Sequence, residues 1–368
     1  MWLKEKSELA MAQISKDFFL GEFEFDQLQY VPSNLQKGDT KELADVVINY
    51  GNNLIGIQIK ERKNQSASSD EDKWVEKHIA RAKDQLVDTF QQLTNNEIPA
   101  FVNGKGDTCK IKDSGIFTGI IILYNEKLTN YKKVLSCSRL NGIVHCFSYT
   151  DFSDCCRKLV LPRDIMEYIS YRERHLEIDK KSNYEEKALI DEFLMYKYGT
   201  VVFNETEVDT FKWFLNHYKE RLVAGEKDQY RQMLEVFLEL DRAGVNAFAQ
   251  RLSKIISCAK DRINTDNSFI RPANQEMSSY LFISSDSGEN ILEYVQRMTF
   301  LFLYKTKSEK CITVVAYFDT EDEFRLDWIY MEQHWEYDKE MEKFISLPEI
   351  KNMWIPKMIL TGKVNNTD

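Results

Sequence analysis

The sequence predicts an α/β fold, in which a mixed sheet flanked by helices is followed by a mostly helical α+β domain. Two β-branched-rich runs, 43–50 and 54–60, flank a Gly-Asn-Asn turn, the chemistry of an antiparallel hairpin. A helical pattern over 73–93 comes next, and the nearly uninterrupted apolar run 116–124 suits a buried central strand. A hairpin, a helix and a covered strand in this order indicate helices packed on a mixed sheet.

Segments on either side extend this first domain. Residues 3–19 carry apolar side chains at helical spacing, which predicts an amphipathic helix, and 23–30 resembles a strand. Beyond the buried strand, 144–149 is expected to add a strand and 162–175 a helix. The first domain is therefore expected to span 1–177.

The most polar joint of the chain, 177–183, is the predicted boundary between two domains. A chain of 368 residues is longer than one average domain requires. The second domain, 184–368, has helical stripes of Leu, Phe and Val, which are far more often core than function. Its expected role is therefore regulation, recognition or oligomerisation. Its helical patterns cover 184–198, 207–223 and 230–263, and a small α/β end has strands at 280–284 and 311–318 around a helix at 291–304.

The composition, 43% hydrophobic and 29% charged, is typical of a soluble globular protein. No apolar run reaches the length of a membrane span, and the first residues lack the basic-then-apolar order of a secretory signal. The expected location is therefore the cytoplasm, without a membrane partner.

Two counts limit the classes of site. The seven cysteines are scattered without a CxxC pair, and the five histidines show no metal-binding spacing, which argues against a disulfide framework and a zinc site. The net charge of −10 means that the chain as a whole repels polyanions. Any contact with nucleic acid must therefore come from a local basic surface or from metal ions.

The predicted hairpin gathers three polar side chains. Strand alternation places Gln58 and Lys60 on one face of the second strand and the isoleucines on the other. A turn centred between the glycine and the first asparagine sets Asp45 directly across from Gln58. A carboxylate, an amide oxygen and an ammonium group then converge on the face that a helix should cover, where unpaired polar groups are costly.

A divalent ion would remove this cost. Mg²⁺, or Mn²⁺, prefers hard oxygen ligands and keeps several waters, so Asp45 and the Gln58 carbonyl are candidate ligands beside a phosphate group. Lys60 would orient the attacking water or stabilise the charge that develops on the phosphate. The alternative is an ordinary hairpin with one cross-strand polar pair.

Asp45, followed after twelve residues by Gln58-Ile59-Lys60 on a hairpin, resembles the signature of the PD-(D/E)XK nucleases. The resemblance covers roughly the first third of the chain and implies a restriction-endonuclease-like domain with a metal-dependent site. In that family an Asp and an acid-x-Lys form the active site, commonly with a Glu on the preceding helix. Glu8 fits that helical position, and Glu5 is the substitute one turn earlier.

Two residues depart from the signature. Ala44 stands where the motif has Pro, and Gln58 replaces the usual acid, which should weaken metal binding. The Mrr-like restriction nucleases also carry a Gln-x-Lys version, so the resemblance implies that activity can survive this change. Gln85, on the following helix, resembles the helical Gln of RecB-like nucleases and is a candidate substrate contact.

Positive charge near this hairpin is modest. Arg62 and Lys63 follow the candidate catalytic lysine and are candidate contacts to nucleic acid. The next basic residues, Lys73, Lys77, Arg81 and Lys83, are interleaved with Asp70, Glu71, Asp72, Glu76 and Asp84. Charge runs of this size usually indicate only a solvated face.

These features favour a metal-dependent nuclease that acts on DNA, and the family resemblance suggests restriction or anti-phage defence as its setting. RNA as a substrate, a homo-oligomer and a partner protein of a defence system stay open. The alternative is a module that keeps the nuclease fold without catalysis and binds nucleic acid or a protein. A third interpretation makes the C-terminal domain an interaction scaffold.

Overall fold

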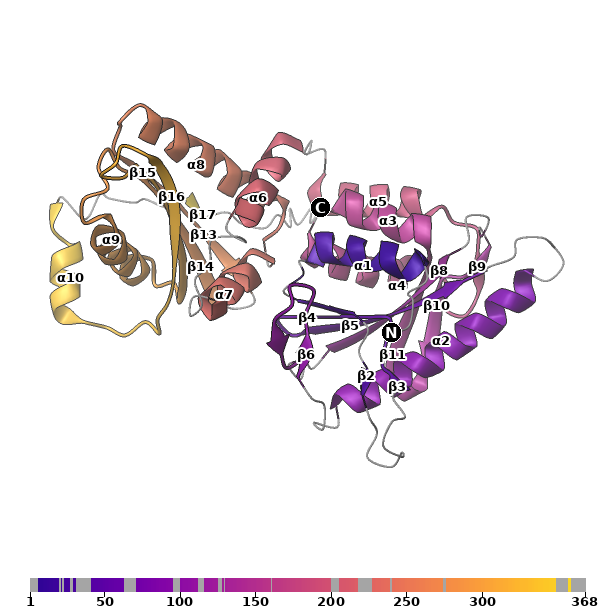
Figure 1. Cartoon of the computed structure of the whole chain (residues 1–368). Coiled ribbons are helices and arrows are strands. Elements are labelled where there is room, and N and C mark those ends of the chain that lie inside the picture. The colour runs from indigo at the N-terminus through magenta and orange to yellow at the C-terminus, as the bar shows by residue number, and fades with distance from the viewer. Residues whose placement is uncertain are drawn as a thin grey trace. The chain divides into compact units, whose positions relative to one another are not determined.

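The computed structural model divides the chain into two compact units, residues 1–199 (unit 1) and 200–368 (unit 2), each with its own sheet (Figure 1). The predicted α/β class is confirmed. The structure describes residues 6–19, 21, 23–26, 29–30, 41–62, 71–94, 100–111, 116–124, 128, 130–159, 161–199, 205–217, 227–238, 240–273, 276–348 and 357–358.

Unit 1 is built on a mixed six-stranded sheet of order β1-β4-β5-β8-β11-β10. The first three strands are antiparallel, β5, β8 and β11 are parallel, and β10 returns antiparallel to β11. The strands are β1 Glu24–Asp26, β4 Val46–Tyr50, β5 Asn53–Glu61, β8 Ile116–Tyr124, β10 Val134–Cys137 and β11 Gly142–Ser148. Three short pairs lie outside this sheet: β2 Gln29–Tyr30 with β3 Lys41–Glu42, β6 Phe101–Val102 with β7 Thr108–Cys109, and β9 Tyr131–Lys132 with β12 Lys181–Ser182.

Helices cover both faces of this sheet. In Figure 1, α2 (Glu71–Thr94) lies on one face, and α1 (Lys6–Phe19), α3 (Tyr149–Leu159), α4 (Pro162–His175) and α5 (Glu186–Tyr198) lie on the other. The central strands are apolar toward both sides because both sides are buried. Since β5 and β8 are parallel, α2 must run back along the sheet, antiparallel to β5.

The predicted elements of unit 1 correspond closely to the observed ones. The strand 116–124 and the helix 162–175 are confirmed with the same bounds, and the helix expected at 73–93 is α2. The helix α3 was not predicted. Its buried stripe consists of Phe152, Cys155, Cys156 and Leu159, which is a weak apolar signal because half of it is cysteine.

The predicted domain boundary at 177–183 is wrong, since the chain divides after Gly199. The polar joint is fastened to the edge of the sheet: Asp179 accepts hydrogen bonds from the backbone and side chain of Ser136, and β12 pairs with β9. The helix after the joint packs against α3 and α4. High polarity therefore marks a surface turn of unit 1 rather than a linker.

A buried charge pair holds α5 in place. The Glu186 carboxylate, 2% exposed, accepts hydrogen bonds from Arg172 Nε at 2.7 Å, Tyr168 Oη at 2.5 Å and Lys133 Nζ at 3.3 Å. Arg172 also donates to two backbone carbonyls and lies 4.0 Å from the centre of the Phe147 ring. Burial opposes ionisation of Glu186, but Arg172 and Lys133 outweigh it and hold the pKa of the carboxyl below its usual value.

Substitution Glu186→Gln should destabilise unit 1 by about 3 to 5 kcal/mol, because it leaves the buried Arg172 guanidinium without its counter-charge. Native-state hydrogen exchange of the β11 amides measures the effect in unit 1. Glu177→Gln is the matched control, since the exposed pair of Glu177 with Lys180 should contribute about 0 to 1 kcal/mol. Equal effects of the two substitutions would contradict this role of Glu186.

His145 gives unit 1 a dependence on pH. The ring is 1% exposed, and its Nδ1 lies 3.4 Å from Arg172 Nη1, so Nδ1 accepts and the ring is neutral. Burial is the largest cause that lowers the pKa of His145 below 6.5; Arg172 lowers it further, whereas Glu173 opposes the shift. A lowered pKa in the folded state means that the unfolded chain takes up the proton first as the pH falls.

The stabilisation that neutral His145 gives unit 1 should therefore be fully present above pH 6.5. It should decrease as the pH falls below that value towards the lowered pKa of His145 in the folded state. His145→Gln should reduce this dependence, whereas His334→Gln, at an exposed position, should keep it. Urea midpoints from circular dichroism at several pH values test this. A dependence unchanged in His145→Gln would exclude His145 as its source.

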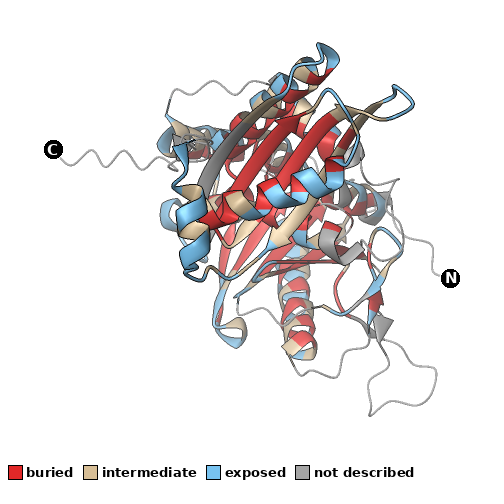
Figure 2. Ribbon diagram, turned by 90° about the vertical axis from the view of Figure 1, so that its left-hand side faces the viewer, coloured by how far each residue is buried: buried red, intermediate tan, exposed pale blue. Residues whose placement is uncertain are grey.

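Unit 2 has a five-stranded sheet of order β16-β15-β14-β13-β17, also covered on both faces. Phe248 of α8 packs against Tyr280 and Phe282 on one face, whereas Val295 and Phe302 of α9 belong to the core on the other. The strands β14 and β15 are mostly buried, whereas β16 is mostly of intermediate burial, and the helices are two-sided (Figure 2). The elements are α6 Glu205–His217, α7 Lys227–Leu238, α8 Arg242–Lys260, β13 Thr265–Ala273, β14 Glu276–Ser284, α9 Ile291–Thr306, β15 Lys310–Phe318, β16 Phe324–Glu332, α10 Lys339–Ile345 and β17 Lys357–Met358.

Two expectations for unit 2 need correction. The helical region 230–263 is divided into α7 and α8, because Asp241 caps α8 by accepting from the Gly244 amide at 2.8 Å. The strand β13 was also not predicted. The acidic run 319–323 forms the turn between β15 and β16. Among the residues described, no helix has the length and apolarity needed to cross a bilayer.

Candidate active site

The β4–β5 hairpin has the predicted register. Val46 pairs with Ile57 and Tyr50 with Asn53, around a turn in which Gly51 has a φ of +51°. Gly56 faces α2, because a Cβ there would lie 3.2 Å from a Leu86 methyl group. Side chains of a strand alternate, so Gln58 and Lys60 share that face with Gly56.

Asp45 lies one residue before the ladder begins, opposite the end of β5. Its Oδ2 accepts a hydrogen bond from the Ile59 backbone N–H at 2.5 Å. The carboxylate thus occupies the place where a strand carbonyl would otherwise accept, and it lies against the backbone between Gln58 and Lys60. This contact fixes Asp45 at the start of β4 in a half-buried position.

Gln58 is 1% exposed, and protein groups surround both ends of its amide. Nε2 donates to the Leu43 carbonyl at 3.3 Å, and Oε1 accepts from Lys60 Nζ at 3.0 Å. Only one orientation of the amide satisfies a carbonyl at one end and an ammonium at the other. The oxygen is therefore turned toward Lys60, and Thr89 of α2 completes the arrangement by donating to the same Leu43 carbonyl at 2.5 Å.

Gln58 and Lys60 are thus bonded to each other, and Asp45 is bonded to the backbone of Ile59 between them. Two of them, Asp45 and Gln58, present oxygen atoms of the kind that Mg²⁺ or Mn²⁺ accepts. This donor set carries a single negative charge, and within the described part of the chain no group of three or more His, Cys, Asp or Glu side chains is placed to hold a metal ion. An ion held by these two residues would have to complete its coordination with waters and with oxygens of a phosphate.

The other predicted site residues are placed less completely. Glu8 belongs to α1, but its side chain, like the whole of Glu5 and Lys63, lies outside the described residues. Its neighbour Ser7 donates to Glu61 at 2.6 Å. This turn of α1 therefore lies beside the end of β5 that carries Lys60.

Gln85 lies on α2, one turn before Thr89, and thus on the side of the helix that contacts the hairpin. Its Oε1 atom is buried and has no hydrogen-bond partner among the described residues. An unsatisfied buried amide oxygen is unfavourable, so this atom would gain from a donor brought by a bound molecule.

Two aromatic residues on α2, one of them in contact with Arg62, were not predicted as part of the site. The Arg62 guanidinium lies 5.9 Å from the centre of the Trp74 ring, and Trp74 stacks on His78 at 4.4 Å. Both rings are half-buried. Their spacing of four residues places them on one side of α2, which is the only signal that the sequence offered.

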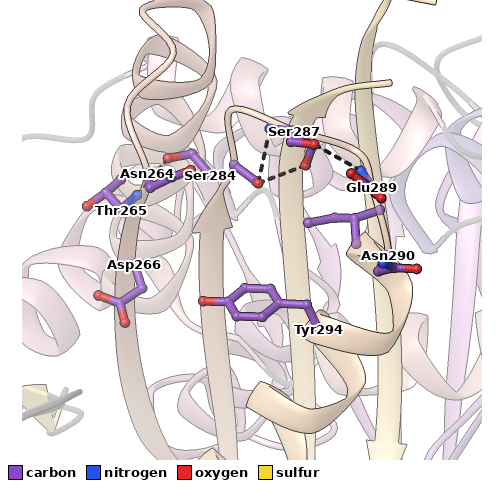
Figure 3. A pocket seen from close by; sticks show the side chains of 10 residues that line it. Asn264, Thr265, Asp266, Ser284, Ser287, Glu289, Asn290 and Tyr294 are labelled. Carbon is purple, nitrogen blue, oxygen red and sulfur yellow. Dashed lines mark hydrogen bonds between the residues drawn. The ribbon is translucent and has the colours of Figure 1, made fainter. Parts of the chain in front are cut away.

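Unit 2 contains a separate pocket of about 620 Å³, at the ends of β13 and β14 beside the start of α9 (Figure 3). Two of its serine hydroxyls accept hydrogen bonds from backbone N–H groups of the same loop. Ser287 N–H donates to Ser285 Oγ, and Glu289 N–H donates to Ser287 Oγ. Tyr294 points across the pocket toward Asp266, and burial together with this carboxylate raises the pKa of the phenol. None of the predicted catalytic residues lines this pocket.

No protein-family model matches the chain, and no curated protein matches it in sequence.

Substitution Gln58→Glu tests the structural role of the amide. It restores the acid of the nuclease signature, but it also removes the N–H donor to Leu43. A carboxylate oxygen then faces the Leu43 carbonyl oxygen, and the two repel each other. We expect a loss of about 1 to 3 kcal/mol in the stability of unit 1. Gln91→Glu, at an exposed position of α2, is the control and should have little effect. Equal unfolding midpoints for both variants would contradict the importance of this hydrogen bond.

Proposed function

We propose that the chain is a metal-dependent nuclease that hydrolyses phosphodiester bonds in DNA. The observation that carries this proposal is the hydrogen bond between Gln58 and Lys60 on a strand whose Ile59 amide binds the Asp45 carboxylate. The mixed sheet flanked by helices is compatible with the restriction-endonuclease-like domain that the sequence motif implies. Restriction or anti-phage defence is the biological setting that we propose from the same motif.

Each residue has a defined task in this proposal. Asp45 and the Gln58 oxygen would hold Mg²⁺ or Mn²⁺, and the ion when bound would polarise the phosphate and lower the pKa of a water. The Ile59 amide fixes the Asp45 carboxylate, so the ligand does not need to reorganise. The Gln58 oxygen holds the Lys60 ammonium at 3.0 Å, where it would stabilise negative charge developing on the phosphate.

The hydrogen bonds at both ends of the Gln58 amide favour a second function. Both ends of its amide are bonded to protein groups and the residue is 1% exposed, as in a purely structural buried amide. In that case unit 1 would bind nucleic acid or a protein without cutting a strand. Cleavage and binding measured in the same samples separate the two functions.

The nuclease proposal predicts cleavage of supercoiled or linear DNA, or of RNA, in Mg²⁺ or Mn²⁺. Asp45→Asn should lower the rate on the order of 10²-fold or more, because the amide keeps an acceptor for Ile59 N–H but removes the charge. Lys60→Met should have a loss of the same order, since it keeps the apolar stem and removes the ammonium. Gel assays under single-turnover conditions measure both effects.

Controls for this assay are Asp88→Asn and Lys187→Met, which remove the same charges at exposed positions. They should cleave as the wild type does. The nuclease proposal fails if the wild type leaves every substrate intact, or if Asp45→Asn and Lys60→Met cleave as fast as the controls. Binding without cleavage would instead support the second function.

A further inference from the structure

The position of α2 links its exposed side to the candidate active site. The helix packs on the face of β5 that carries Gln58, and it runs antiparallel to that strand. Its N-terminal half therefore lies near the end of β5 that carries Lys60. The contact between Arg62 and Trp74 marks this end directly.

Three basic side chains form a ridge on this half of the helix. Lys73, Lys77 and Arg81 are four residues apart, so they lie on one face and span about 12 Å at about 1.5 Å per residue. All three are exposed, and none of them has an ion pair with any residue that the structure describes. We refer to these three residues as the basic ridge.

Two of the acidic residues that interrupt this charge in the sequence have partners away from the ridge. Asp72 pairs with Lys181 at 2.8 Å, and Asp84 pairs with Arg139. Glu76 is exposed and lies one turn from Asp72, but it is also only three residues from Lys73. Folding therefore directs Asp72 and Asp84 to partners away from the basic ridge, on a molecule of net charge −10.

The flank between the ridge and β5 carries the stacked pair of Trp74 and His78. Each aromatic residue directly follows a lysine of the ridge in the sequence. Cations beside half-exposed aromatic rings form the kind of surface that proteins use to follow a nucleic-acid backbone.

From these positions we infer that the basic ridge binds the phosphate backbone of a DNA strand and leads it to the site of Asp45, Gln58 and Lys60. This inference rests on the proposed function for its substrate, and it adds the surface on which that substrate lies. Each side chain of the ridge would contact one phosphate and release condensed counterions, which makes binding dependent on salt.

The test is binding of short labelled DNA, single-stranded and duplex, to the full-length protein in a chelator, measured by fluorescence anisotropy at several salt concentrations. The variant Lys73→Gln/Lys77→Gln/Arg81→Gln should bind at least about ten-fold more weakly. The slope of log K against log salt should fall by about 2 to 3, at about 0.7 to 0.9 for each phosphate that the variant no longer neutralises. The double variant Lys73→Arg/Lys77→Arg should keep wild-type binding, because it keeps the charge.

The matched control is Lys187→Gln/Lys212→Gln/Lys339→Gln, which removes the same charge from exposed positions elsewhere. It should bind as the wild type does. Equal losses in the two triple variants, or no loss in the ridge variant, would overturn the inference, as would the absence of any DNA binding by the wild type.

Acetylation footprinting of the wild type gives a second readout that needs no variant. DNA should protect Lys73 and Lys77 from an amine-reactive reagent and should leave Lys187 and Lys212 reactive. Equal reactivity of all four lysines with and without DNA would also overturn the inference.

The inference and the proposed function can fail separately. Ridge-dependent binding by a protein that never cleaves DNA would refute the nuclease and leave the binding surface intact. Cleavage of DNA by a protein whose binding does not involve the ridge would do the reverse.

Discussion

The arrangement of the candidate site depends on the burial of the Gln58 side-chain amide on the face of the sheet that α2 covers. Gln58 lies on a strand that is apolar on both sides, and its side chain is 1% exposed. Its nitrogen must donate to the Leu43 carbonyl and its oxygen must accept from Lys60, because a buried polar group without a partner costs free energy. These bonds fix the lysine, and the lysine is the group that the proposed chemistry needs near a phosphate.

The same rule governs the opposite side of unit 1. Arg172 and Glu186 are buried together, and additional hydrogen bonds satisfy both of them, which is the condition under which a buried ion pair is tolerated. The pair joins α4 to α5 and fastens α5 to the sheet through Lys133. In both places the buried polar groups specify which segments pack against each other, while the apolar residues supply most of the stability.

Local patterns in the sequence were sufficient for the elements around the site. The turn after Tyr50 determines the register of the hairpin, and the apolar run 116–124 has only one reasonable place in an α/β domain. The placement of Gln58 and Lys60 on one face of β5, across from the start of β4, follows from that register. The contact of Arg62 with Trp74 required the fold, because it depends on where α2 and the end of β5 meet. The hydrogen bond from the Ile59 N–H to Asp45 required the side-chain conformation of Asp45, which the register does not give.

Longer-range features were beyond what the sequence pattern could indicate. The boundary was misplaced since the polarity of 177–183 reflects exposure, whereas the burial of Glu186 depends on Arg172 and Lys133. The separation of the helical region 230–263 into two helices depends on a single capping residue, Asp241. The division of charges across α2 is a property of helix geometry and of partners on β12 and the 138–140 turn.

The late position of Glu186 also bears on how the protein is made. Arg172 precedes its carboxylate partner by 14 residues, and Lys133 precedes it by 53. During synthesis from the N-terminus, the sheet strands and α4 leave the ribosome while both cations still lack this counter-ion. The first half of the protein can therefore reach its final packing only after α5 has emerged, so that translation of this one helix is the step that completes it.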